Sequence, residues 1–589
     1  MAQNRAIRHS LKAEVQHFPG KSSENPGTGR WSRYGWITTK LVLLILFVAF
    51  TNPNVGQRVG VLLAQGRLGT LLPYFAVWGL AGLALAVAVL QPNRWIRFFW
   101  AAVLAASTAA AWGYYSASQS EFNVFDIISL WNARHETDRA AEFYARHVQM
   151  AGLVLLAGFV IMSLPGSPKG RLGKWLTRLS WFPLVPVAAM AAIVILKSGG
   201  GSQALPQQFS PLALASVAAS KIAFQSTPAR AAVTWQPAST GPRENIVILM
   251  DESIGADFID LTPGNPHTPG FAKYASRFVN FGRAVSGGNC SNYSNAIVRF
   301  GASRIDVAGS INASPTLWQY AKAAGYRTVF IDAQAGNISN PGLMQNFMTL
   351  QEKNTIDVFH AIRGVAAADA DMQLADILAK ELQSNQPTFI YANKNGAHFP
   401  YDEAYPASAA IYHPTMTQAG KDTTETRIAS YRNAIRWSVD TFIERLFTTA
   451  NVSNTTLLYT SDHAQIFDPT RLTHCIVDAP EAQMAVVPLL VTTPDPAKRQ
   501  ALENGARLLQ GKASHFQIVP TVLSWMGYAQ ADIASRYDES LTTGTTRLPA
   551  FTSGDVFGLF SSEIFWWPAD LSKDLRDPAA KTILPTGGT

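Results

Sequence analysis

The first third of the chain is dominated by long apolar stretches with few charged residues. A helix needs about 20 residues to cross a bilayer, with a lower limit of roughly 17. We therefore expect five membrane-spanning helices, at residues 36–51, 71–90, 98–115, 148–164 and 179–196. The first is short and contains Lys40, whose charged end we expect to snorkel outward. Buried helices of a soluble domain are the alternative, which the clustering of five such stretches disfavours.

The pattern changes after residue 244, where short apolar runs alternate with helical stretches. Runs typical of buried strands occur at residues 245–250, 328–331, 388–391, 455–459 and 486–491. The clearest helix between them covers residues 315–324 and ends just before Gly325. Such alternation predicts an α/β domain with a mostly parallel central sheet that is covered by helices on both faces.

These two patterns divide the chain into four parts. We expect a cytoplasmic tail at residues 1–35, a transmembrane domain with five helices at 36–198, a bridging linker at 199–243 and a catalytic domain at 244–589. The linker is rich in glycine and proline around a helix expected at residues 212–224. Residues 122–128, between the third and fourth spans, are amphipathic enough to lie on the bilayer surface.

The placement of basic residues predicts the orientation in the membrane. Much of the net charge of +8 lies in the tail, so the charge does not imply a nucleic-acid partner, and we expect none. The loops at residues 91–97 and 166–178 are rich in Lys and Arg, and together with the tail they should be cytoplasmic. Five spans then deliver the catalytic domain to the opposite side, which in a bacterium is the periplasmic side of the inner membrane.

The chain has two cysteines, Cys290 and Cys475. Two are too few for a disulfide framework or a cysteine-rich zinc site. Free thiols are the favoured expectation, because sequence neighbourhood to candidate site residues does not give the Cα separation that a disulfide needs. A disulfide between them in an oxidising compartment is the alternative.

Three element ends carry residues that can bind a metal or attack a substrate. The strand at 245–250 leads to Glu252, and the strand at 455–459 leads to Asp462 and His463. Between them Ser291 lies in a turn of small residues before a helix-like stretch at 295–300, where backbone amides suit a nucleophile that carries a phosphoryl group. Two carboxylates, an imidazole and an alkoxide can form a zinc site. Each residue alone is equally typical of a helix cap or a turn.

The order of these residues resembles that of the membrane phosphoethanolamine transferases and their phosphoglycerol-transferase and sulfatase relatives in the alkaline-phosphatase superfamily. The resemblance covers nearly the whole chain, as five spans, a bridge and a sulfatase-like α/β domain. The matching segments are Asp251-Glu252-Ser253, Thr268-Pro269-Gly270-Phe271, Gly288 through Ser294, Asp332-Ala333-Gln334-Ala335-Gly336, Gly396-Ala397-His398-Phe399-Pro400-Tyr401 and Ser461 to Ala464, with His474 downstream.

The resemblance implies a site with one zinc ion, or with two. Its metal ligands are expected to be Glu252, Ser291, Asp462 and His463. Ser291 is also the expected catalytic nucleophile. The expected substrate-binding residues are His398, His474 and, in an outer loop that touches the donor lipid, Asn132, Thr137 and Glu142.

The chain also departs from the family pattern. Gly255 stands where the family usually has an arginine, Asn393 where it often has a histidine, and the nucleophile is serine rather than the commoner threonine. The cysteines of the usual disulfides are missing. Cys290 lacks the Pro and Arg of the Cys-x-Pro-x-Arg motif that sulfatases convert to formylglycine, so we do not expect that nucleophile.

The expected function is zinc-dependent transfer of phosphoethanolamine from a membrane phospholipid to an envelope acceptor, such as lipid A or another glycan. The transfer would pass through a covalent phospho-Ser291, and we expect the enzyme to be a monomer. A phosphoglycerol transferase, or a hydrolase of the phosphodiesterase or sulfatase type, is the alternative among enzymes. A catalytically inactive membrane scaffold is the alternative outside them.

Overall fold

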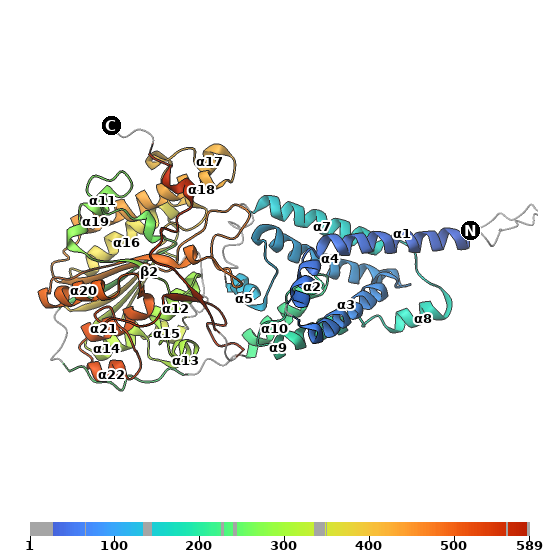
Figure 1. The fold of residues 1–589 in the computed structure, drawn as a ribbon, viewed down its shortest axis with the longest axis horizontal. Coiled ribbons are helices and arrows are strands. Elements are labelled where there is room, and N and C mark those ends of the chain that lie inside the picture. Colours follow the sequence, from blue (N-terminus) through green and yellow to red (C-terminus); the bar gives the residue numbers. More distant parts are fainter. Residues whose placement is uncertain are drawn as a thin grey trace, which may run out of the picture.

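A computed structural model describes residues 28–64, 66–132, 144–224, 229–238, 244–334, 348, 350–560 and 564–585. The molecule is elongated, with helices at its N-terminal end and an α/β domain at the other (Figure 1). Most of the expected cytoplasmic tail falls outside the described residues. We refer to the two ends as the helical half and the α/β half.

The helical half consists largely of apolar helices. They are α1 (Thr28–Thr51), α2 (Val55–Ala64), α3 (Leu68–Val89), α4 (Arg94–Ser118), α5 (Val124–Asn132), α7 (Ala145–Ser163), α8 (Gly170–Arg178), α9 (Leu184–Leu196) and α10 (Ser210–Phe224). By length and composition α3, α4 and α7 can cross a membrane, and α1 with α2, bent by 61°, makes a fourth span if the pair is one span. α9 is apolar but has 13 residues. The described residues thus hold three or four helices of spanning length, and the count of five stays a prediction.

Lys40 does not snorkel outward, so that expectation was wrong. Its side chain is fully buried, and its ammonium donates hydrogen bonds to the carbonyl oxygens of Val89 and Leu164. These carbonyls belong to the C-terminal ends of α3 and α7, where helical carbonyls have no partner within their own helix. A cation there also meets the negative end of each helix dipole.

The α/β half is built on an eight-stranded sheet with the order β4-β3-β5-β1-β6-β7-β2-β8. Its strands are β1 (Asn245–Asp251), β2 (Val279–Val285), β3 (Arg327–Asp332), β4 (Val358–Ala361), β5 (Thr388–Asn393), β6 (Thr455–Ser461), β7 (Val486–Thr492) and β8 (Ala513–Ser514). The five neighbours from β4 to β6 are parallel, and β7 runs antiparallel to both β6 and β2. The expected mostly parallel sheet is confirmed. A separate hairpin joins β9 (Ala550–Gly554) and β10 (Ile564–Pro568).

Helices cover both faces of the sheet, as Figure 1 shows. Side chains alternate across β1, so Ile246 and Ile248 enter one hydrophobic core while Val247 and Leu249 enter the other. The helices are α11 (Pro269–Ala272), α12 (Ser291–Arg299), α13 (Val307–Ala313), α14 (Leu317–Ala323), α15 (Leu350–Lys353), α16 (Ala367–Glu381), α17 (Met416–Ala419), α18 (Thr424–Ile435), α19 (Phe442–Thr449), α20 (Pro496–Leu508), α21 (Ile518–Trp525) and α22 (Gln530–Ala534). Burial on both faces explains why β1 is a continuous apolar run.

The two halves meet in a hydrophobic cluster that we call the junction. It contains Phe125 of α5 and Leu214 of α10 from the helical half, and Val477 and Phe560 from the α/β half. The ring of Phe560 packs edge-on against Phe125, at 5.7 Å between centroids. α5 covers most of the amphipathic segment expected at residues 122–128, and α10 covers the linker helix expected at 212–224. Both helices contribute to the junction.

Candidate active site and metal centre

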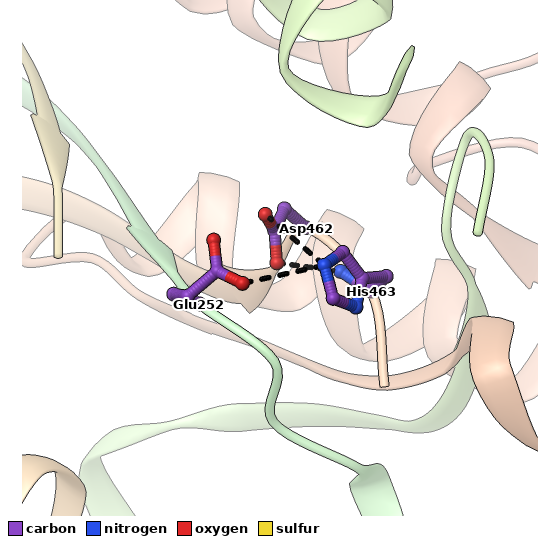
Figure 2. A group of neighbouring side chains, drawn as sticks. All are labelled: Glu252, Asp462 and His463. Atoms are coloured by element: carbon purple, nitrogen blue, oxygen red, sulfur yellow. Dashed lines mark hydrogen bonds and ion pairs between the residues drawn. The ribbon is translucent and has the colours of Figure 1, made fainter. Parts of the chain in front are cut away.

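The sheet brings the expected metal ligands together at the carboxyl ends of two neighbouring strands. β1 and β6 are parallel, and Asp251 is paired in register with Ser461. Glu252 and Asp462 follow directly, so their side chains emerge next to each other at one edge of the sheet. Figure 2 shows Glu252, Asp462 and His463 facing one another. All three are fully buried, and one ligand atom from each lies within 4.8 Å of the others.

Backbone hydrogen bonds orient two of these ligands. Nδ1 of His463 donates to the carbonyl oxygen of Ala464 at 2.9 Å, which leaves Nε2 directed to Glu252 Oε1 at 3.3 Å. Oδ1 of Asp462 accepts from the backbone amides of Ser253, at 3.0 Å, and of His463, at 2.7 Å. Oδ2 of Asp462 is buried and accepts no hydrogen bond from any residue that the structure describes.

Ser291 stands at the first position of α12 and contacts the same group. Its Oγ lies 3.0 Å from Nε2 of His463 and 3.2 Å from Oε2 of Glu252. The helix begins four residues earlier than the sequence pattern predicted, because residues 291–294 are polar yet almost all buried. The N-terminal end of a nine-residue helix carries a partial positive charge that suits a phosphoryl group.

The electrostatics of the group favour a cation. Burial and the neighbouring Glu252 carboxylate raise the pKa of Asp462 well above its usual range. Burial opposes the charging of His463, but Asp462 and Glu252 raise its pKa to about 9. Two buried carboxylates side by side are costly unless a positive charge compensates them.

The residues present fit a divalent metal ion. Oδ2 of Asp462 is a buried carboxylate oxygen that accepts no hydrogen bond from the described residues, and the hydrogen bond from Nδ1 of His463 to Ala464 leaves Nε2 as the ring nitrogen that can bind a metal. Carboxylate oxygens, an imidazole and a hydroxyl form a donor set that suits zinc. Glu252, Asp462, His463 and Ser291, the four expected ligands, are thus adjacent in space.

The sequence prediction gave no role to three supporting residues, although Gln334 and Gly396 lie in segments that match the family pattern. Gln334, just after β3, donates from its amide to Oε2 of Glu252 at 2.8 Å and to the carbonyl oxygen of Lys394 at 2.7 Å. Lys394, just after β5, is fully buried and pairs with Asp251 at 2.5 Å. Gly396 has a φ of +54° and lies against the backbone of Glu252. Their position at the carboxyl ends of β3 and β5 was the signal that could have identified them.

Of the expected substrate-binding residues, His474 and His398 lie within the described residues and the side chains of the other three do not. The ring of His474 stacks on that of His463 with 4.2 Å between centroids, and its Nδ1 lies 2.9 Å from Thr473 Oγ1. His398 is half-buried, and its Nδ1 donates to the carbonyl oxygen of Phe399 at 2.8 Å. Asn132 is the last residue of α5. The side chain of Asn132, and Thr137 and Glu142 altogether, lie outside the described residues.

Cys290 and Cys475 form a disulfide, which corrects the expectation of free thiols. Their Cα atoms are 4.6 Å apart although 185 residues separate them in sequence. Cys290 directly precedes Ser291, and Cys475 directly follows His474. Folding back of the chain, rather than any sequence pattern, brings them together.

Comparison with known proteins agrees with this architecture. Residues 244–528 match the sulfatase family model. The solved structure of the integral membrane protein lipooligosaccharide phosphoethanolamine transferase A (EptA) from Neisseria meningitidis is similar, with 15% sequence identity and a TM-score of 0.59 over 84% of this chain and 96% of that one. The two share a fold over most of their lengths.

Two further solved structures are similar to part of this chain. The C-terminal periplasmic domain of EcEptC from Escherichia coli is 17% identical, with a TM-score of 0.45 over 56% of this chain and 94% of that one. The lipoteichoic acid synthase LtaP from Listeria monocytogenes is 14% identical, with a TM-score of 0.36 over 53% and 77%. No curated protein sequence matches this chain.

Proposed function

We propose that this chain, which carries a sulfatase domain at residues 244–528 beside a bundle of apolar helices, transfers phosphoethanolamine from a membrane phospholipid to a hydroxyl of an envelope glycolipid or glycan. Residues 244–589 are the catalytic part, on the periplasmic side of a bacterial inner membrane, and 36–198 anchor them. Residues 1–35 are a cytoplasmic tail and 199–243 a linker. The fold shared with a protein named as a phosphoethanolamine transferase supports this reaction class.

The observation that carries the proposal is the position of the Ser291 hydroxyl. Its Oγ touches both Nε2 of His463 and Oε2 of Glu252, at the start of a helix. A serine used only as a helix cap has no need of two metal-binding side chains within hydrogen-bond distance. The same arrangement suits a nucleophile whose oxygen must lose a proton and accept a phosphoryl group.

Glu252, Ser291, Asp462 and His463 would hold a zinc ion. When bound, the ion would act as a Lewis acid that lowers the pKa of the serine hydroxyl and offsets negative charge developing on phosphorus. The chain itself fixes the geometry of this group. Two backbone amides hold Asp462, Ala464 holds the imidazole of His463, and Gln334 holds Glu252.

The transfer takes two balanced steps. First, Oγ of Ser291 bonds to the donor phosphorus and the bond from phosphorus to the glycerol oxygen breaks, which leaves a phosphoethanolamine ester on Ser291 and releases diacylglycerol. The serine proton leaves along its hydrogen bond to Glu252 Oε2, and the glycerol oxygen takes a proton from His398. Second, an acceptor oxygen attacks the same phosphorus and gives its proton to His398, while the bond from phosphorus to Ser291 Oγ breaks and Ser291 regains its proton from Glu252.

Attachment to the membrane fits a lipid donor. Donor and a lipid-linked acceptor lie in one leaflet, so a tethered domain meets both without releasing either. The junction holds the α/β half against α5 and α10. A freely diffusing enzyme would need a separate way to extract a phospholipid from the bilayer.

The test uses the full chain in liposomes with a phospholipid labelled in its headgroup. Acid quenching and peptide mapping should find the label on Ser291, together with one diacylglycerol released per label. Ser291→Ala should carry no label, while Ser535→Ala, at an exposed serine remote from the site, should label normally. A zinc-loaded protein whose Ser291 takes no label and that releases no diacylglycerol would refute the proposal. Labelling from phosphatidylglycerol alone, or release of the headgroup to water, would replace it with the phosphoglycerol transferase or the hydrolase.

A further inference from the structure

One short segment contacts residues 289 and 290 (the nucleophile loop, just before Ser291), the expected metal ligand His463 and the helical half. We call residues 474–478 the strap. At its start the ring of His474 stacks on His463. Next, Cys475 is bound to Cys290, the residue before the nucleophile.

The strap is linked to the nucleophile loop by hydrogen bonds as well. The backbone amide of Cys475 donates to the carbonyl oxygen of Asn289 at 2.8 Å, and the side-chain amide of Asn289 donates to the carbonyl oxygen of Ile476 at 2.7 Å. Asn289 is fully buried and Cys290 nearly so, so this contact is closed to water. A disulfide and two hydrogen bonds therefore tie the strap to residues 289 and 290.

The other end of the strap belongs to the junction. Val477 is buried in the cluster with Leu214 of α10 and Phe125 of α5. The amide of Gln203 reaches Asp478 Oδ2 at 3.4 Å. Lys221 of α10 donates to the carbonyl oxygen of Leu559, at 2.7 Å, beside the same cluster.

We propose that the strap positions Ser291. The packing of the α/β half against the helical half at the junction determines where the strap, and with it Ser291, lies. The proposal rests on the proposed function only in taking Ser291 as the nucleophile. In physical terms, a shift of the junction moves Val477, and the disulfide passes the shift to the first turn of α12. Residues 475–478 of the strap thus position Ser291 and take no part in the chemistry.

Backbone strain in the strap points the same way. Cys475 has a φ of +60°, in the left-handed region that side chains other than glycine rarely adopt. Such a conformation persists only where surrounding contacts enforce it. Without the disulfide we expect Cys475 to relax and Ser291 to lose its register with His463.

The first experiment cuts the disulfide in the full chain. Cys290→Ala/Cys475→Ala should lower kcat roughly 10- to 100-fold, the cost of a displacement of about 1 Å at a reacting atom. KM should stay within about twofold and zinc content should be unchanged, because neither cysteine is an expected metal ligand. Unchanged kcat would overturn the proposal. If the double variant does not fold, the wild type is reduced with a dithiol and its thiols are capped, with the same expected result.

The second experiment tests coupling to the junction with matched leucines. Leu214→Ala perturbs the junction, and Leu104→Ala is the control, since Leu104 is equally buried in α4 but belongs to a different cluster. We expect Leu214→Ala to lower kcat at least about threefold with the disulfide intact and to have no further effect once it is cut. Equal effects in both backgrounds would refute coupling through the strap.

Hydrogen exchange separates this proposal from the function itself. Leu214→Ala should speed exchange of the amides of residues 289–294 only while the disulfide is present, and Leu104→Ala should not. This readout needs no turnover. A protein inactive on every phospholipid would therefore defeat the proposed function and still decide the role of the strap.

Discussion

Gly396→Ala should damage the site through a residue that never contacts substrate. Gly396 lies just after β5 with a φ of +54°. A Cβ atom there would come within 2.5 Å of Oδ1 of Asp251 and 2.7 Å of the amide nitrogen of Glu252, and closer still to the carbonyl oxygen of Glu252. Two of these neighbours are backbone atoms of Glu252, just after β1, and the third is a buried carboxylate oxygen that accepts a hydrogen bond from the Glu252 amide, so none can swing aside freely.

The structure gives the magnitude. Non-bonded heavy atoms rest at about 3.5 Å or more, so the end of β1 and the Gly396 loop must separate by about 1 Å. The left-handed conformation costs alanine about 1 kcal/mol, and overpacking of this kind adds about 1–3 kcal/mol. Displacement of Glu252 by about 1 Å should lower kcat roughly 100-fold.

Gly420→Ala is the matched control, because Gly420 has a φ of +58° and open space where the Cβ would lie. It should show the conformational cost of about 1 kcal/mol alone, with kcat unchanged. Unfolding of both variants is followed in detergent, together with zinc content and headgroup transfer. Equal losses of stability and activity in the two variants would refute the steric argument.

Three further predictions concern the metal, its support and pH. Removal of the metal by a chelator should abolish transfer, and adding zinc back should restore it. The free energy of unfolding should fall by about 2.7 kcal/mol relative to protein with zinc at 100 times its Kd. A free energy of unfolding that does not depend on zinc would contradict the metal site. Gln334→Leu removes the amide donor to Glu252, so competition titration should find zinc affinity roughly 10- to 100-fold lower, against no change if the contact is incidental. Burial opposes the charging of Glu381, yet its contact with Arg327 lowers its pKa below the unfolded value of 4.5. The stabilisation from Glu381 is therefore present above about pH 4.5 and is lost as the pH falls through the lowered folded-state pKa. Glu381→Gln should lower the Tm more at pH 7 than at pH 3, and an equal shift at both would count against the ion pair.

Much of the α/β half could be predicted because its central strands are buried on both faces. β1 and β6 are continuous apolar runs, and their ends locate Glu252 and Asp462. β2 was missed because its exposed positions alternate with buried ones and it contains Gly282 at a φ of +74°. The short β4 and β8 have too few residues for a pattern.

The parts of the site that escaped prediction depend on contacts between distant segments. Residues 332–336 match a family segment and follow a strand, but neither fact predicts that the Gln334 amide contacts Glu252. The disulfide requires residues 185 positions apart to meet, and its partners became neighbours only through the fold. Lys40 shows the same limit, since a lysine near the end of an apolar run is typical of snorkelling until its acceptors are known.

The hydrogen bonds of Lys40 also have a consequence for the order in which the helices of the helical half can pack during synthesis. Its acceptor Val89 lies 49 residues further along the chain and Leu164 lies 124 residues further. A nascent chain that has released only α1 holds an ammonium without a protein acceptor, and one that stops before α7 satisfies it in part. We infer that α1 reaches its final packing only after α7 has been synthesised, because one of the two acceptors of Lys40 lies at the end of α7.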